Sequence, residues 1–136
     1  MRINHLFIPA TDIEKSTRFY CDLFGFVPTK RFNDGAGDTQ IVHKEVHGSD
    51  LDLLITPIGA AKLPYAHHLA FEANSGVEFE TLLHTARTMG LKPRSQVPLN
   101  SEAGVSTFSM NGKTYRHFYV LDPSWVNIEI LLRVPE

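Results

Sequence analysis

The chain has 136 residues, enough for one domain that buries its own core, and its single cysteine, Cys21, excludes an internal disulfide. Apolar residues make up 43% and charged residues 21%, which is typical of a soluble globular protein, and the formal net charge of -2 disfavours nucleic acid as a partner. Because no apolar run is long enough to span a membrane and the N-terminus lacks a signal-peptide pattern, we expect a cytoplasmic protein with no membrane partner.

The first half of the chain is expected to fold in the order strand, helix, strand, strand. Alternating branched and aromatic residues at the start predict a strand. Thr11 or Asp12 can cap the helix that follows, and Gly25 can end it. The expected elements are a strand over residues 2–8, a helix ending near 24, strands over 39–46 and 51–56, and room for one more strand around 26–32.

The second half repeats this order and contains a hairpin. Ser75 can cap a second helix that runs to about Met89. Asn111 and Gly112 form the strongest short-range hairpin signal in the chain. The apolar face of the second helix is expected to consist of Val77, Leu82, Leu83 and Ala86. The expected strands cover residues 67–72, 105–110, 113–121 and 127–134.

The two halves carry ligand-type residues at similar places. Each half has a histidine near its first strand, His5 or His68, within the similar segments NHLFI and HHLAF. Each half also has a carboxylate on its last strand, Asp52 or Glu129, within LDLLI and IEILL. Two imidazoles and two carboxylates at equivalent places are a ligand set that a divalent metal prefers.

The repeat predicts an α+β fold made of two tandem β-α-β-β-β modules. A single domain over residues 1–136 would consist of a first module, about residues 1–57, and a second module, about residues 65–136, joined by a short linker. The curved sheets of the two modules would surround a shared metal-binding cleft.

Alternation along the strands predicts which side chains face that cleft. If Glu129 points into the cleft, Arg133 on the same strand does too. On the second hairpin strand, Tyr115, His117 and Tyr119 share one face. We interpret these three side chains as one wall of the site.

Two further histidines, His43 and His47, lie four residues apart on one face of a strand in the first half. We interpret them as part of a solvated sheet edge, because polar and charged side chains on an edge strand oppose aggregation. This interpretation gives them no role in the site.

Three segments in chain order carry a family resemblance: INHLFIPATDIEKSTRFYCDLFGF, HHLAFEA and FYVLDPSWVNIE. Together they resemble the vicinal oxygen chelate superfamily, which includes glyoxalase I, methylmalonyl-CoA epimerase, fosfomycin resistance enzymes, extradiol dioxygenases and bleomycin-binding proteins. The resemblance covers nearly the whole chain, and its specificity comes from the order of the three segments.

The resemblance implies a metal site. His5, His68 and Glu129 match the three commonest metal ligands of the superfamily, and Asp52 falls where glyoxalase I has a glutamate. Because aspartate is one methylene shorter, Asp52 would coordinate the metal either directly or through a water molecule. The implied cofactor is one divalent ion, Fe, Ni, Co, Mn or Zn, and the ligand set alone does not select among them.

Three functions are consistent with this resemblance. The first, which Asp52 as a fourth ligand slightly favours, is lyase or isomerase chemistry through an enediolate-type intermediate, with Glu129 or Glu72 as the base. The second is an Fe(II) extradiol-type ring-cleaving dioxygenase, supported by Tyr119 ten residues before Glu129. The third is a non-catalytic drug-binding protein of the bleomycin resistance type. A small molecule with neighbouring oxygens is the expected substrate, and Glu129, Tyr119 and His117 are the expected catalytic residues.

Trp125 departs from the superfamily pattern, which usually has glycine at this point of the turn after Asp122 and Pro123. Glycine there favours a backbone conformation that other residues adopt with difficulty, so we expect this turn to differ in shape. Trp125 would line or cap the cleft. We therefore group it with Tyr115 and Arg133 as substrate-binding candidates.

The resemblance also implies an assembly. In many relatives two chains pair so that each cleft takes one module from each chain, so we expect a homodimer. His5 and Asp52 of one chain could then face His68 and Glu129 of the other.

Overall fold

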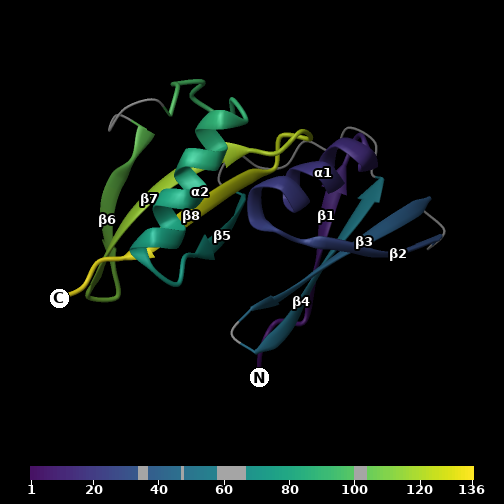
Figure 1. Cartoon of the computed structure of the whole chain (residues 1–136), viewed down its shortest axis with the longest axis horizontal. Coiled ribbons are helices and arrows are strands. Elements are labelled where there is room, and N and C mark those ends of the chain that lie inside the picture. Colours follow the sequence, from purple (N-terminus) through teal and green to yellow (C-terminus); the bar gives the residue numbers. More distant parts are fainter. Residues whose placement is uncertain (34–36, 47, 58–66, 100–103) are drawn as a thin grey trace. The chain divides into compact units, whose positions relative to one another are not determined.

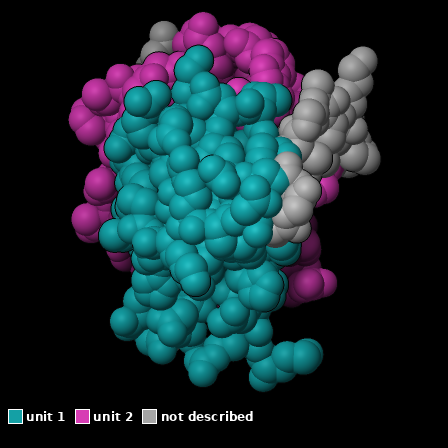
Figure 2. Space-filling view, turned by 90° about the vertical axis from the view of Figure 1, so that its right-hand side faces the viewer, with its two compact units in different colours: residues 1–63 teal, residues 64–136 magenta. Residues whose placement is uncertain are grey.

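The computed structural model describes residues 1–33, 37–46, 48–57, 67–99 and 104–136. The chain divides into two compact units, residues 1–63 and 64–136, which are coloured separately in Figure 2. Each unit is a four-stranded mixed sheet with one helix packed against it (Figure 1). The predicted α+β class and the tandem β-α-β-β-β order are therefore confirmed. No described helix is long and apolar enough to cross a membrane.

The first unit contains five elements in the order β1, α1, β2, β3, β4. They are β1 (His5–Ala10), α1 (Ile13–Phe24), β2 (Val27–Asn33), β3 (Asp38–Val46) and β4 (Ser49–Pro57). The spatial order of the strands is β1-β4-β3-β2, with β1 parallel to β4 and the other pairs antiparallel. The sequence left room for one more strand around residues 26–32, and the structure contains this strand as β2.

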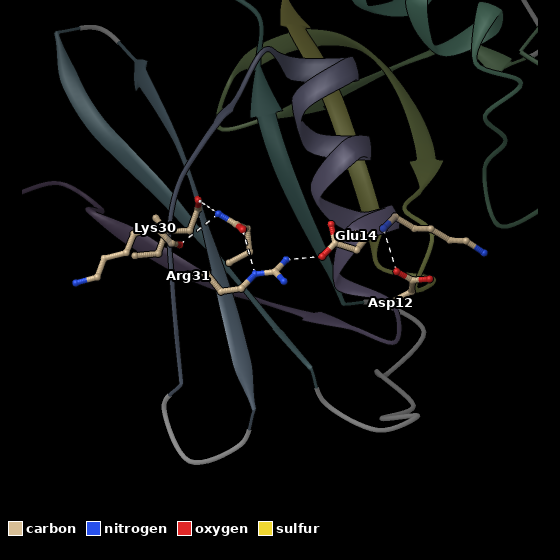
Figure 3. Close-up of polar contacts among 7 residues, drawn as sticks. Asp12, Glu14, Lys30 and Arg31 are labelled. Carbon is tan, nitrogen blue, oxygen red and sulfur yellow. Dashed lines mark hydrogen bonds and ion pairs between the residues drawn. The ribbon is translucent and has the colours of Figure 1, made fainter.

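Helix α1 begins and ends where its sequence predicts. The side chain of Asp12 accepts a hydrogen bond from the Lys15 backbone N–H, and Gly25 ends the helix in the left-handed conformation with φ 76°. Figure 3 shows Arg31 of β2 reaching Glu14 of α1, at 2.5 Å between Nη2 and Oε1. This exposed ion pair connects the helix to the edge strand but adds little stability in water.

The second unit repeats the order with β5, α2, β6, β7 and β8. They are β5 (His68–Glu72), α2 (Gly76–Thr88), β6 (Ser106–Met110), β7 (Lys113–Leu121) and β8 (Asn127–Arg133). The strand order is β5-β8-β7-β6, and β5 is parallel to β8. The first and fourth strands are thus neighbours in both units.

Helix α2 packs on its sheet through a face that the sequence predicted only in part. Ser75 caps the helix by accepting a hydrogen bond from the Glu78 backbone N–H, as expected. Phe79 is fully buried, and its ring meets that of Phe118 on β7 at 5.4 Å between centroids. Val77, which we expected on the buried face, is 79% exposed because it lies in the first turn on the opposite side of the helix.

The β6–β7 hairpin forms at the predicted turn. Asn111 and Gly112 both adopt positive φ angles, 52° and 73°. Two consecutive left-handed residues match the twist of the flanking strands, which explains the preference for Asn-Gly at this position. The hairpin places β7 beside β8, and the register of this strand pair determines which of their side chains lie together.

Candidate functional site

Glu129 is the centre of a polar cluster on the second sheet, on the face that points away from α2. Its neighbours Ile128 and Ile130 are fully buried on the helix side, so alternation directs Glu129 to the other face. Glu129 lies directly opposite Tyr119 of the antiparallel strand β7. The residue is 5% exposed, so its carboxylate depends on neighbouring side chains for its hydrogen bonds.

Three side chains contact this carboxylate. His117 Nδ1 lies 2.7 Å from Oε1, and His68 Nε2 lies 3.2 Å from Oε2. Tyr119 also forms a hydrogen bond with Glu129. Because an ionised carboxylate only accepts hydrogen bonds, His117 Nδ1–H is the donor. The sequence-predicted residues His68, His117, Tyr119 and Glu129 are thus brought together.

The other nitrogen of His117 contacts a residue that the sequence did not single out. Ser106 Oγ of β6 lies 2.8 Å from His117 Nε2. With the proton of a neutral imidazole on Nδ1, Nε2 accepts and the Ser106 hydroxyl donates. Phe108, also on β6, packs on the His117 ring at 4.6 Å between centroids. No sequence pattern singled out Ser106, which lies directly opposite His117 in the β6–β7 pair.

The surroundings of Tyr119 favour its neutral form. Burial raises the pKa of the Tyr119 hydroxyl, and the negative charge of Glu129 and the hydrogen bond to it raise it further. At neutral pH, Tyr119 is therefore a protonated donor beside a carboxylate. Its ring also meets the His68 ring edge-on at 5.9 Å between centroids.

The first unit carries a related cluster around Asp52. Asp52 lies directly opposite His5 of β1 and directly opposite His43 of β3. His43 Nδ1 is 2.7 Å from Asp52 Oδ1, and His43 Nε2 is 3.5 Å from Asp50 Oδ1. His5 Nδ1 lies 3.0 Å from Asn4 Oδ1. His5, Asp52 and His43 therefore form a row across three neighbouring strands.

The interpretation of His43 as an edge residue is wrong. Strand β3 lies between β4 and β2, so both of its sides are hydrogen-bonded. His43 was misplaced because the sequence does not reveal the spatial order of strands. His47 lies outside the described residues.

The two candidate pairs also differ in register, which corrects the expectation of equivalent places. His5 is the direct neighbour of Asp52 across the parallel β1–β4 pair. His68, in contrast, lies opposite Asn127, two residues before Glu129, across the parallel β5–β8 pair. The His68–Glu129 contact is consequently diagonal.

Trp125 adopts the backbone conformation that we expected it to avoid. Its φ angle is 67°, in the left-handed region that favours glycine. Asp122 supports this turn, because its Oδ1 accepts hydrogen bonds from the Ser124 and Val126 backbone N–H groups at 2.8 and 2.9 Å. The prediction of a differently shaped turn is therefore wrong, and the Trp125 side chain is 63% exposed.

The remaining substrate-binding candidates lie beside the cluster. Tyr115 and Arg133 are directly opposite each other in the β7–β8 pair. Tyr115 is buried and stacks on Phe108 at 5.3 Å between centroids. Arg133 is exposed, with Nη2 4.0 Å from Glu136 Oε1. Of the two, Arg133 has the freedom to meet a ligand.

Comparison with known proteins supports the resemblance. Residues 2–130 match the model of the Glyoxalase/Bleomycin resistance protein/Dioxygenase superfamily. The chain belongs to this superfamily. No curated protein of significant sequence similarity was found.

Solved structures of the superfamily share the fold. A glyoxalase/bleomycin resistance protein/dioxygenase from Alicyclobacillus acidocaldarius is 19% identical, with 98% of this chain and 92% of that chain covered and a TM-score of 0.66. The oxidase ChaP-H2 is 23% identical, with 98% and 94% covered and a TM-score of 0.66. A domain from Frankia sp. EAN1pec is 15% identical, with 98% of both chains covered and a TM-score of 0.67. At these identities, the likeness establishes the fold alone.

Proteins of this superfamily generally use a divalent metal, and the donor atoms of the two clusters fit one. Imidazole nitrogen and carboxylate oxygen are ligands of Fe, Ni, Co, Mn and Zn. Each unit contributes two candidates, His5 with Asp52 and His68 with Glu129. Within the described parts of the chain, no three His, Cys, Asp or Glu side chains are arranged to hold a metal.

Proposed function

We propose that this protein is a metal-dependent enzyme acting on a small molecule with neighbouring oxygens. The proposal rests on the distance of 3.2 Å between His68 Nε2 and Glu129 Oε2. A neutral imidazole nitrogen and a carboxylate oxygen at this spacing can both bind one divalent ion. In the proposed site, His5 supplies a third ligand and Asp52 a fourth, from the same chain or from a second copy.

The side chains around Glu129 support catalysis. When bound, a divalent metal supplies Lewis acidity toward the oxygens of a substrate. His117 occupies Oε1 of Glu129, which leaves Oε2 to act as the ligand atom. Tyr119 remains protonated at neutral pH, so its hydroxyl can donate a hydrogen bond or a proton to a substrate oxygen. Arg133 and the exposed Trp125 are available to contact the rest of the substrate.

Lyase or isomerase chemistry is the first candidate reaction. Such chemistry moves a proton at the carbon next to a carbonyl group, and a carboxylate on the site wall acts as the base. The supporting observation is that Asp52 lies directly opposite His5, on the same face of the sheet. A second carboxylate beside a histidine gives the two-His, two-carboxylate set expected for this branch.

Ring cleavage by an extradiol-type dioxygenase is the second candidate. It requires three protein ligands, His5, His68 and Glu129, and open positions for the substrate and oxygen. Tyr119 favours it, because a neutral tyrosine beside the ligand carboxylate can exchange a proton with a catecholic oxygen. In this case Asp52 would have no place at the metal.

Metal analysis tests the proposal. Protein purified without chelator is expected to contain about one divalent ion per complete site, and His68→Ala is expected to lose it. His84→Ala provides the control, because His84 is an exposed residue of α2. Equal metal content in the wild type and His68→Ala would refute the site, as expected for a metal-free drug-binding protein.

Activity assays then separate the two reactions. Oxygen consumption with catechols after anaerobic loading with Fe(II) would identify the dioxygenase. Turnover of 2-oxoaldehyde adducts or 2-substituted acyl thioesters with Ni(II), Co(II) or Mn(II), without oxygen consumption, would identify the lyase or isomerase.

A further inference from the structure

We propose that His43 and His117 are a matched pair of positioning residues, each of which aims one carboxylate of the site at the metal. This inference rests on the proposed metal-dependent function and assigns its supporting residues. His43 would position Asp52, and His117 would position Glu129. Neither imidazole would itself bind the metal.

The two contacts are made by corresponding strands of the two units. His43 is on β3 and His117 is on β7, and each is the third strand of its β-α-β-β-β module. Both histidines use Nδ1, and both lie 2.7 Å from a carboxylate oxygen on the last strand. The atom and the distance are the same in both units, but the register differs: His43 is directly opposite Asp52, whereas His117 is opposite Leu131 and reaches Glu129 diagonally.

A donor on one carboxylate oxygen determines what the other oxygen can do. His117 Nδ1–H holds Glu129 Oε1, and Oε2 is the oxygen that faces His68. His43 Nδ1–H likewise holds Asp52 Oδ1, and Oδ2 would then be the ligand atom. Hydrogen-bonded partners of this kind orient metal ligands, and their loss typically costs about 10- to 100-fold in metal affinity.

The imidazoles are themselves held in place, to different degrees. His117 has a 13% exposed side chain, packs between Phe108 and Tyr119, and contacts Ser106 Oγ through Nε2. His43 has a 36% exposed side chain, and its Nε2 is 3.5 Å from the nearest Asp50 oxygen. We therefore expect His117 to contribute more to metal affinity than His43.

The test compares variants that keep or remove the donor. Asparagine can place an amide N–H close to the position of Nδ1, whereas leucine has a similar size and no donor. Co(II) binding to His117→Asn and His117→Leu is measured by calorimetry, and the visible absorption of bound Co(II) reports its ligand geometry. His84→Leu on the exposed side of α2 is the control, and the same two substitutions are made at His43.

We expect His117→Leu to bind Co(II) about 10- to 100-fold more weakly than the wild type, with an altered absorption spectrum. His117→Asn should recover most of this affinity and the wild-type spectrum. The His43 variants should follow the same pattern with a smaller loss.

Two results would overturn the inference. One is an unchanged affinity and spectrum in His117→Leu, and the other is an equal loss in the asparagine and leucine variants, which would indicate packing rather than hydrogen bonding. If the wild type itself bound no Co(II), the proposed function would fail instead. Thermal unfolding of each variant identifies any that do not fold, and alanine then replaces leucine as the substitution without a donor.

Discussion

Tyr119 lies directly opposite Glu129 in the antiparallel β7–β8 pair and forms a hydrogen bond with its carboxylate. This carboxylate is also contacted by His117 and His68. A buried carboxylate with three polar neighbours is restrained in position before any ligand binds. The pKa of the Tyr119 hydroxyl therefore depends on this environment.

In metal-free protein, Tyr119 is predicted to ionise above the ordinary tyrosine pKa of about 10. Burial and the Glu129 charge favour the neutral phenol in the folded state, so the folded pKa is the higher one. Its contribution to stability is therefore complete below the unfolded pKa and is lost as the pH rises through the folded pKa. The ultraviolet absorbance of tyrosinate, compared between the wild type and Tyr119→Phe, isolates this titration.

Glu129→Gln provides the matched control for that titration. The amide removes the negative charge at nearly the same size, so the pKa of Tyr119 should move down toward its ordinary value. Identical Tyr119 titrations with and without the Glu129 charge would contradict the predicted coupling.

Trp125→Gly is predicted to stabilise the protein. The left-handed conformation at Trp125 costs a non-glycine residue about 1 to 2 kcal/mol, whereas glycine adds about 0.5 to 1 kcal/mol of unfolded-state entropy. Because the indole is 63% exposed, little packing is lost, and a net gain of about 0.5 to 1 kcal/mol is expected. Urea unfolding measures the change.

Trp125→Ala separates backbone strain from the loss of the ring. Alanine keeps the strain and removes the ring, so it should show no such gain. A loss of substrate affinity in both variants would support the assignment of Trp125 to substrate binding.

Phe79→Ala is predicted to lower the free energy of unfolding by about 3 to 5 kcal/mol, because it empties the fully buried space against Phe118. Val77→Ala on the same helix should change it by less than about 0.5 kcal/mol, because Val77 is 79% exposed. Denaturant unfolding of both variants tests this assignment of the α2 face. Comparable losses would show that α2 is rotated from the described orientation.

Mixing two inactive variants tests how the site is assembled. If each site takes His5 from one chain and His68 from the other, unfolding and refolding His5→Ala together with His68→Ala should restore one of the two metal sites in every mixed dimer. Metal content of the refolded mixture is the measurement. If both ligands come from one chain, the mixture should bind no more metal than the separate variants.

Much of the fold could be predicted from local sequence signals. Asp12, Gly25 and Ser75 mark helix ends through well-defined backbone chemistry, and Asn111-Gly112 marks a hairpin. Alternation also separated the buried Phe118 and Val120 from their site-facing neighbours. These signals are short-range, so a single sequence is sufficient to reveal them.

The errors have two sources, tertiary pairing between strands and local contacts that outweigh an intrinsic preference. The placement of His43 depended on β3 being an interior strand, and strand order arises from tertiary pairing rather than from local pattern. The prediction for Trp125 followed intrinsic backbone preference, which the two Asp122 hydrogen bonds override. Ser106 became a candidate only when β6 and β7 were seen in register.

The two-residue offset between the His5–Asp52 and His68–Glu129 pairs has an evolutionary consequence. Successive side chains on a strand alternate between faces, so a shift by two residues keeps a side chain on its face, whereas a shift by one removes it. After a gene duplication, each half could therefore move its carboxylate along the strand in steps of two and still present it beside an imidazole. The halves of such a protein can diverge in the spacing of their polar groups while each retains the same chemical components.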